Sequence, residues 1–338
     1  MPRRCLASVG LAVLLFGCDS SSSVDIKTPG FAPAAVLRAV LAADRVPTVR
    51  VTVSRDPYGA PAEPGVAPPT PAGAVVSVWR DGVRVETLAH QPQTCYRSVQ
   101  TSCNAETGRT ETDTSGPYDC GAFRGTVPIV PGATYTVRAE VPGLPSANAT
   151  VAVPVAAALA VADGVAPDPD TRSLGVTVTD VPGPDSRFGL IVLREYDRFS
   201  TSICRRGGLR DTTIVLVGTA YRYQDRFGTA DPVLLADATD LPGDIALATF
   251  RDATFRDGRH EARLTLNRQP RADVGGTGRL TVQLAVLSTG LYDAYRVAGV
   301  ALAADNPFTE PADLPSNVVG GYGRVEAVAL SEATVEAP

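Results

Sequence analysis

Short segments in which apolar and polar residues alternate recur along the chain from about residue 36 onward. In one of them, Val49, Val51 and Val53 would share one face of an extended strand, with polar residues on the other face. The pattern predicts half-buried β-strands, and a tight hairpin turn is expected at Asp81-Gly82. Comparable runs in the first half of the chain occupy residues 74–80, 83–88, 126–129, 134–141 and 147–153.

The strand pattern divides the chain into two β-rich parts and predicts an all-β fold class. Residues 34–155 are predicted to form an immunoglobulin-like β-sandwich, because about seven short strands with frequent turn signals are typical of that fold. Residues 156–338 are predicted to form a second β-sandwich-like domain with one short helix at 291–304. Tyr292 and Tyr295 recur there at helical spacing, which favours core positions over the alternative of a ligand cleft.

A different pattern opens the chain. Two arginines precede an apolar run at residues 5–16, which is too short to span a bilayer stably. A glycine and Cys18 follow, so residues 1–17 are predicted to be a lipoprotein signal peptide and 18–33 a flexible tether. Cys18 is the expected attachment point for diacylglycerol, which makes the lipid bilayer a partner. An ordinary secretory signal with a chance cysteine is the alternative.

The charge of the mature chain limits the class of partner. Cleavage before Cys18 leaves 29 basic and 36 acidic residues, a net charge of −7. This mild acidity argues against nucleic acid or anionic lipid headgroups as binding partners.

Four of the six cysteines remain once the signal is removed and Cys18 is acylated. They are Cys95, Cys103, Cys120 and Cys204. An even number in an oxidising compartment predicts two disulfides, one between two of the first three cysteines and one between the remaining cysteine and Cys204, with three connectivities possible. A zinc site is the alternative, but no C-x-x-C spacing occurs and the chain holds only two histidines.

No segment carries a recognisable motif for catalysis, nucleotide binding or metal binding. His90 and His260 lack supporting motifs and are interpreted as solvated residues near turns. Glu195 and Asp197 would lie on one face of a strand, as glycosidase carboxylates can, but a solvated strand face has the same pattern. An Asp-rich turn at 167–170 is interpreted as solvated rather than as a calcium loop. We therefore expect no enzymatic activity, no catalytic residues, no metal and no cofactor.

Motifs in the C-terminal half resemble a known family. Residues 250–258 read FRDATFRDG, residues 306–311 read NPFTEP, and Ser316-Asn317 precedes GGYG at 320–323. In this order they resemble the domain-of-unknown-function family four-two-four-nine, whose members are outer-membrane lipoproteins associated with TonB-dependent receptors. The resemblance implies an outer-membrane location, a TonB-dependent β-barrel as partner and no established enzymatic activity.

Two long polar segments are the expected contact surfaces. Residues 56–73 and 91–120 are interpreted as exposed loops, with Tyr58 and Tyr96 as candidate aromatic anchors for a partner. Together these features predict an exported, non-catalytic outer-membrane lipoprotein that assists a TonB-dependent transporter in nutrient capture. The alternative is a structural or adhesive cell-surface β-sandwich protein without a transporter partner.

Overall fold

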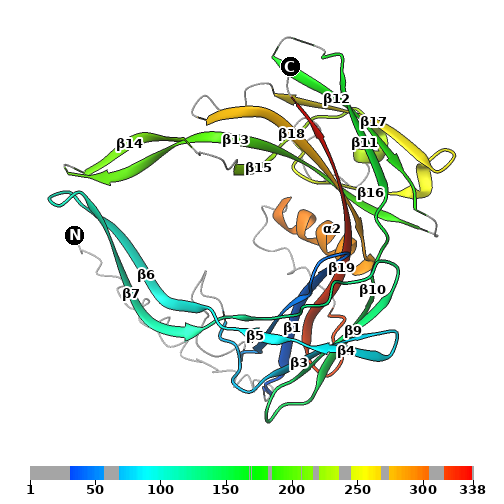
Figure 1. Ribbon diagram of the computed structural model, residues 1–338. Helices are drawn as coiled ribbons and strands as arrows, with labels where there is room; N and C mark the ends of the chain where they lie inside the picture. The colour runs from blue at the N-terminus through cyan, green and yellow to red at the C-terminus, as the bar shows by residue number, and fades with distance from the viewer. Residues whose placement is uncertain are drawn as a thin grey trace, which may run out of the picture.

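The computed structural model describes residues 31–56, 68–166, 168, 170–181, 185–206, 208–215, 221–235, 245–267, 274–303 and 316–336. The predicted signal peptide, Cys18, Tyr58 and the NPFTEP motif lie outside these residues, as do most of the tether and most of segment 56–73. The described chain is built mainly of β-strands, which confirms the all-β fold class (Figure 1).

The first sandwich packs a four-stranded sheet against part of a larger sheet. The four-stranded sheet runs in the order β10 (Ala147–Ala152), β9 (Thr134–Glu140), β3 (Val75–Arg80) and β4 (Val83–Thr87). The larger sheet contributes part of β19 (Tyr322–Val335), then β1 (Ala35–Ala42), β2 (Thr48–Val53), β8 (Ala122–Arg124) and β5 (Ala89–Gln91).

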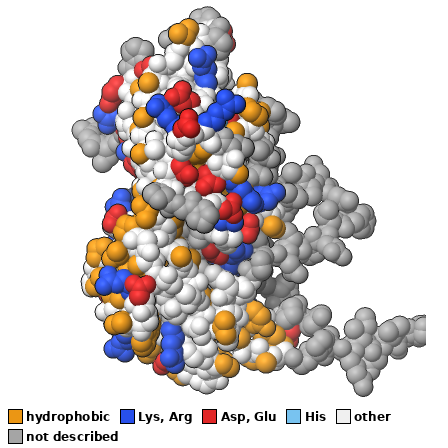
Figure 2. Space-filling view, turned by 90° about the vertical axis from the view of Figure 1, so that its right-hand side faces the viewer, with side chains coloured by type: hydrophobic (Ala, Val, Ile, Leu, Met, Phe, Trp, Pro, Cys, Tyr) orange, Lys and Arg blue, Asp and Glu red, His pale blue; other side chains and the backbone are white. Residues whose placement is uncertain are grey.

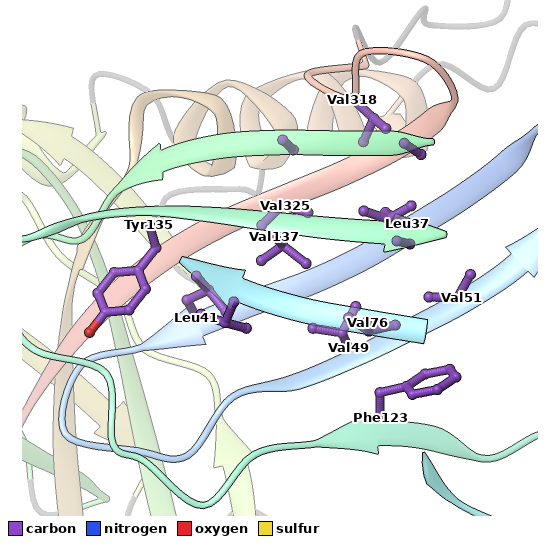
Figure 3. Packing of buried hydrophobic residues seen from close by; sticks show 14 of the residues in the cluster. Leu37, Leu41, Val49, Val51, Val76, Phe123, Tyr135, Val137, Val318 and Val325 are labelled. Atoms are coloured by element: carbon purple, nitrogen blue, oxygen red, sulfur yellow. The ribbon is translucent and has the colours of Figure 1, made fainter. Parts of the chain in front are cut away.

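Period-two alternation builds the core of this sandwich. Along β9, Tyr135, Val137 and Ala139 are buried, and the residues between them are not. These side chains meet Leu37 from β1 and Val49 from β2, as predicted from the alternating pattern (Figure 3).

The second sandwich packs the other end of the large sheet against three strands. The large sheet continues from β19 through β18 (Val274–Leu287) and β13 (Arg187–Arg205) to β14 (Gly208–Val215), and β15 (Tyr221–Asp225) and β16 (Ala248–Arg251) also pair with β13. The facing sheet consists of β11 (Ala158–Gly164), β12 (Thr171–Thr179) and β17 (Arg259–Asn267). Its core, which includes Leu174, Phe188 and Leu284, is separate from that of the first sandwich.

Strand β19 belongs to both sandwiches. Residues 322–328 pair in parallel with β1, and residues 328–335 pair antiparallel with β18. Val325 and Ala327 lie in the first core, whereas Ala329 lies in the second. The large sheet is therefore continuous through both sandwiches, and residues from the C-terminal part of the chain complete the sandwich formed by the N-terminal part.

Helices contribute little to the described structure. Helix α2 (Thr289–Ala303) corresponds to the helix predicted at 291–304, and the short elements are α1 (Pro232–Leu235) and the 3₁₀ helix η1 (Asp252–Thr254). Tyr292 is fully buried against Leu287 and Val328, so its predicted core position is confirmed. Tyr295 is 43 % exposed, so the same prediction is wrong for it. Within the described ranges, no helix is long and apolar enough to cross a membrane.

Residues 91–120 were expected to be a loop, but most of them form a β-hairpin, which we call the ribbon. Its strands β6 (Thr94–Asn104) and β7 (Arg109–Asp119) pair antiparallel in a sheet of their own. Asn104 Oδ1 accepts two backbone N–H groups in the turn, and Gly108 adopts a φ of 71°. The loop prediction is wrong because these strands lack the apolar alternation on which strand prediction relies.

Candidate functional site

A network of buried and partly buried polar side chains lies where the two sandwiches meet, around Glu326. This residue lies on β19 between Val325 and Ala327, which point into the first core, so its own side chain points to the opposite face of the sheet. Only 4 % of the side chain is exposed. A carboxylate buried to this degree needs charged and hydrogen-bonding partners, because desolvation of an unpaired charge is costly.

Three residues donate hydrogen bonds to the Glu326 carboxylate. Ser288 Oγ donates to Oε2 at 2.7 Å, and Arg324 donates from Nε at 3.1 Å and Nη2 at 3.0 Å to Oε1. Asn317 Nδ2 lies 3.5 Å from Oε1 and also donates to the Val325 carbonyl at 2.7 Å, while Asn317 Oδ1 accepts the Val325 N–H at 3.0 Å. The network thus joins the Ser316-Asn317 motif, β19 and the residue that precedes α2.

Because residue 290 is a glycine, the first turn of α2 can lie directly against the Glu326 carboxylate. A Cβ atom at this position would collide with the Glu326 carboxylate, and the Gly290 carbonyl accepts a hydrogen bond from Arg324 Nη2. Ser288 Oγ also accepts a hydrogen bond from the Ala327 N–H at 3.1 Å. The Ser288 hydroxyl therefore forms hydrogen bonds with β19 rather than capping α2. The first turn of α2 is therefore fixed to β19 by polar contacts.

A groove of about 490 Å³ borders the network. One wall is the edge of β10 from Thr150 to Val153, and the other includes Thr289, Gly290 and Asp293 from the start of α2. Arg324 also lines the groove, and its buried Nη1 has no hydrogen-bond partner among the described residues. The volume lies within the range of small-molecule pockets in proteins.

The two predicted disulfides are confirmed. Cys95 pairs with Cys120 at the base of the ribbon, and Cys103 pairs with Cys204 at its tip, with Cα–Cα distances of 5.8 and 5.3 Å. The second bond joins the ribbon to the hairpin of β13 and β14, so that the two hairpins meet on the side of the molecule opposite β19 (Figure 1). Arg206 Nε adds a hydrogen bond of 3.1 Å to the Glu106 carbonyl.

The ribbon exposes one of the two candidate anchor residues. Tyr96, on β6 close to the base disulfide, is 39 % exposed. Tyr58 lies outside the described residues, so the structure does not bring the two tyrosines together. Most other ribbon side chains whose burial is described are exposed. The ribbon therefore contributes to neither hydrophobic core.

Asp119 fixes the base of the ribbon beside Cys120. Its Oδ1 accepts the N–H groups of Gly121 at 2.8 Å and Gln93 at 3.2 Å, and His90 Nε2 lies 3.1 Å from Oδ2. The hydrogen bond from Gly121, with smaller contributions from Gln93 and His90, holds the pKa of Asp119 below its ordinary value of 3.8. His90 is thus exposed, and it is paired with a carboxylate.

Acid should weaken this contact. A carboxylate whose pKa is lowered by folding stabilises the protein at pH values above 3.8, and that contribution is lost as the pH falls through the lowered pKa. We expect the urea midpoint of the wild type to fall more between about pH 6 and pH 3 than that of Asp119→Asn, which cannot titrate. Equal falls in the two proteins would contradict this assignment.

His260 differs from the sequence interpretation. It lies within β17 with 12 % of its side chain exposed, and its Nε2 is 3.2 Å from Asp231 Oδ1. Its ring stacks on Phe255 with centroids 5.3 Å apart. The same carboxylate oxygen accepts two N–H groups at the start of α1. The prediction of a solvated turn residue is wrong, because the aromatic cluster covers the ring and Asp231 holds it.

The Glu195 carboxylate is also held in structural contacts. Its side chain is 8 % exposed, and its oxygens lie 3.1 Å from Arg222 and 3.5 Å from Arg279. Two register shifts between β13 and β18 flank Tyr196, so the simple alternation that would align Glu195 with Asp197 is interrupted there. In the described part of the chain, no group of three or more His, Cys, Asp or Glu side chains could hold a metal ion.

Neither a protein-family model nor a curated protein matches the sequence. The family resemblance therefore rests on its motifs alone. Sequence reasoning did not find the Glu326 network, although two signals were present. One is the placement of Arg324 and Glu326 two residues apart, directly before the apolar run 327–330, and the other is the Ser316-Asn317 motif, whose Asn317 contacts Glu326.

Proposed function

We propose that this chain is an exported, lipid-anchored, non-catalytic outer-membrane protein that assists a TonB-dependent transporter in nutrient capture. The observation that carries the proposal is the ribbon with a disulfide at each end. Disulfides form and persist in oxidising compartments, which agrees with the export signal and with Cys18 as the lipid attachment point. The outer membrane and the transporter come from the family resemblance.

The ribbon supports a role in partner contact. A two-stranded sheet without a hydrophobic face is at best marginally stable in water, so it needs the disulfides at its base and tip. A preorganised surface loses little conformational entropy when a partner binds. Tyr96 is an exposed aromatic side chain on this surface, of the type enriched at interface hot spots. We therefore assign the transporter contact to the ribbon.

Co-purification from native membranes tests this function. Replacement of residues 96–118 by a short Gly-Ser linker, combined with Cys204→Ser to avoid a free thiol, should abolish recovery of a TonB-dependent barrel with the protein. The control is Cys103→Ser/Cys204→Ser, which loses the same tip disulfide but keeps the ribbon and Tyr96. Mass spectrometry of the same preparation detects acylation of Cys18.

The outcomes of that experiment are distinct. Recovery of the barrel with the control but not with the linker variant supports the ribbon as the contact. Equal recovery of the barrel with both would place the contact elsewhere, and failure to recover any barrel with the wild type would overturn the proposed function.

A further inference from the structure

A row of arginines crosses three neighbouring strands of the large sheet. Arg38 of β1 lies directly opposite Arg50 of β2, and it also lies beside Arg324 of β19 in the parallel pairing of these strands. In each strand a residue adjacent to the arginine belongs to the first core, so the arginines point to the other face of the sheet. This face also carries α2, since Ala42 of β1 packs against the cluster that contains Tyr292.

Arg38 and Arg50 lack a counter-charge. Both side chains are exposed, and neither forms a salt bridge or a side-chain hydrogen bond within the described part of the chain. Arg124 of β8, which lies diagonal to Arg50 across the sheet, is also exposed and has no such partner there. Residues directly opposite each other in an antiparallel pair have Cβ atoms about 4.5–5.5 Å apart, and like charges at this spacing destabilise a sheet. The Arg38–Arg50 pair therefore costs stability in the absence of a negatively charged group.

Two other arginine pairs in the described strand pairings do have acidic partners. Arg187 and Arg251 face each other across β13 and β16, and Asp185 lies 2.8 Å from the first and 4.0 Å from the second. The other pair flanks the turn before β17, where Arg259 forms an ion pair with Glu261 at 2.8 Å. Basic and acidic side chains are likewise intermingled over the second sandwich (Figure 2). The pair on β1 and β2 has no acid of this kind in the described structure, which points to a negative group supplied by a ligand.

We propose that Arg38 and Arg50 bind the phosphoryl group of a soluble phosphate monoester. The pair carries two positive charges, and a phosphate monoester carries a charge of about −1.5 to −2 at neutral pH and has three acceptor oxygens. Each guanidinium can donate two parallel hydrogen bonds to such a group, and two directly opposed side chains can reach it together. A single carboxylate has one negative charge and two oxygens, so one guanidinium is sufficient to pair with it.

Residues beside the pair extend the site. Arg124 adds a third positive charge on the β8 side. On the β19 side Arg324 forms an ion pair with Glu326 at 3.0 Å, so the excess positive charge lies on β1, β2 and β8. Tyr322, two residues before Arg324 and on the same face, is 54 % exposed. Its ring provides an apolar surface for the organic part of the ester.

The position of this face favours a small soluble ligand over a lipid headgroup. The large sheet curves, and the face that carries α2 is the inner side of the curve (Figure 1). The two hairpins joined by Cys103–Cys204 lie across from β19 on that side. A flat bilayer surface cannot follow a concave face of this kind, whereas a small ester can reach it from solution. The site uses neither the ribbon nor the transporter contact.

Titration calorimetry of the full mature chain with phenyl phosphate, with both disulfides intact, tests the site. At about 20 mM salt, where surface charges are little screened, we expect a dissociation constant below about 1 mM. Arg38→Gln and Arg50→Gln should each weaken binding about tenfold, because each removes a charged hydrogen-bond donor. The control is Arg84→Gln, which removes an exposed arginine from β4 in the four-stranded sheet and should change the affinity by less than about twofold.

Unfolding in urea gives a second measurement. Without ligand, Arg50→Gln should unfold at the same or a slightly higher urea concentration than the wild type, because the substitution removes the opposed like charge. Phenyl phosphate should raise the urea midpoint of the wild type, since it binds the folded state, and should raise that of Arg50→Gln much less.

Each outcome bears on the proposal. Binding of phenyl phosphate that is weakened in Arg38→Gln and Arg50→Gln but not in Arg84→Gln supports it. No binding up to about 10 mM, or equal affinity of all three variants, overturns it. Equal or tighter binding of benzoate overturns the phosphoryl group as the ligand chemistry. Binding of vesicles that contain phosphatidic acid without binding of phenyl phosphate overturns the soluble source. The measurement involves no transporter, so its result is separate from that of the co-purification experiment.

Discussion

Replacement of Cys103 and Cys204 by serine should lower the free energy of unfolding by about 4.7 kcal/mol in the chain-entropy description. The two cysteines are separated by 101 residues, so their bond removes a long loop from the unfolded ensemble. For a chain of this size the midpoint of thermal unfolding should fall by about 7 °C. Differential scanning calorimetry of both proteins measures the change.

The other disulfide provides a matched control. Cys95 and Cys120 are separated by only 25 residues, so Cys95→Ser/Cys120→Ser should cost less, about 3.5 kcal/mol. The tip variant should also become sensitive to proteolysis in the turn of the ribbon, because the tip then loses its covalent bond to the β13–β14 hairpin. Equal stability of the tip variant and the wild type would contradict the assigned role of the Cys103–Cys204 bond.

Arg324→Ala should lower the free energy of unfolding by about 3 to 5 kcal/mol, the range for breaking a buried ion pair. The substitution leaves the Glu326 carboxylate buried with only Ser288 and Asn317 as hydrogen-bond donors. It also removes the hydrogen bond to the Gly290 carbonyl, which fixes the start of α2. Urea unfolding followed by circular dichroism gives the magnitude.

Arg38→Ala is the matched control for this substitution. Arg38 lies directly opposite Arg324 in the parallel pairing of β1 with β19, but its side chain is exposed. Its loss should change the free energy of unfolding by no more than about 0.5 kcal/mol. Glu326→Gln in the Arg324→Ala background should recover part of the loss, because it removes the unpaired charge. Equal effects of Arg38→Ala and Arg324→Ala would show that Glu326 needs no buried cation.

Local patterns predicted the local parts of the fold. Val49 and Val51, which the alternation places on one face of a strand, are both fully buried residues of β2. Asp81 and Gly82 adopt the positive φ values of 50° and 84° that the hairpin turn requires. Cysteine number and compartment were also sufficient to predict two disulfides, but not that Cys103 is the partner of Cys204, because the spacing leaves three connectivities open.

Features that depend on distant partners were not predictable from these patterns. Nothing in the sequence of β1 indicates that residues 322–328 pair with it. Alternation with a period of two shows which side chains share a face of the strand, but not which strand lies beside it. The ribbon lacks an apolar face and was therefore interpreted as a loop. Glu326 lies against Gly290 at the start of α2. These two residues are far apart in the sequence, so no local pattern indicates that they are in contact.

The position of β19 determines when the chain can fold. The residues of β19 that complete the first sandwich are synthesised after strands β1 to β18, although β1 is their neighbour in the sheet. Until β19 has been made, the edge of β1 that it pairs with has no such partner, and forming this contact closes a loop that spans most of the described chain. Completion of the first sandwich is consequently a late step that couples the two halves of the chain, which would suit the proposed export of an unfolded polypeptide.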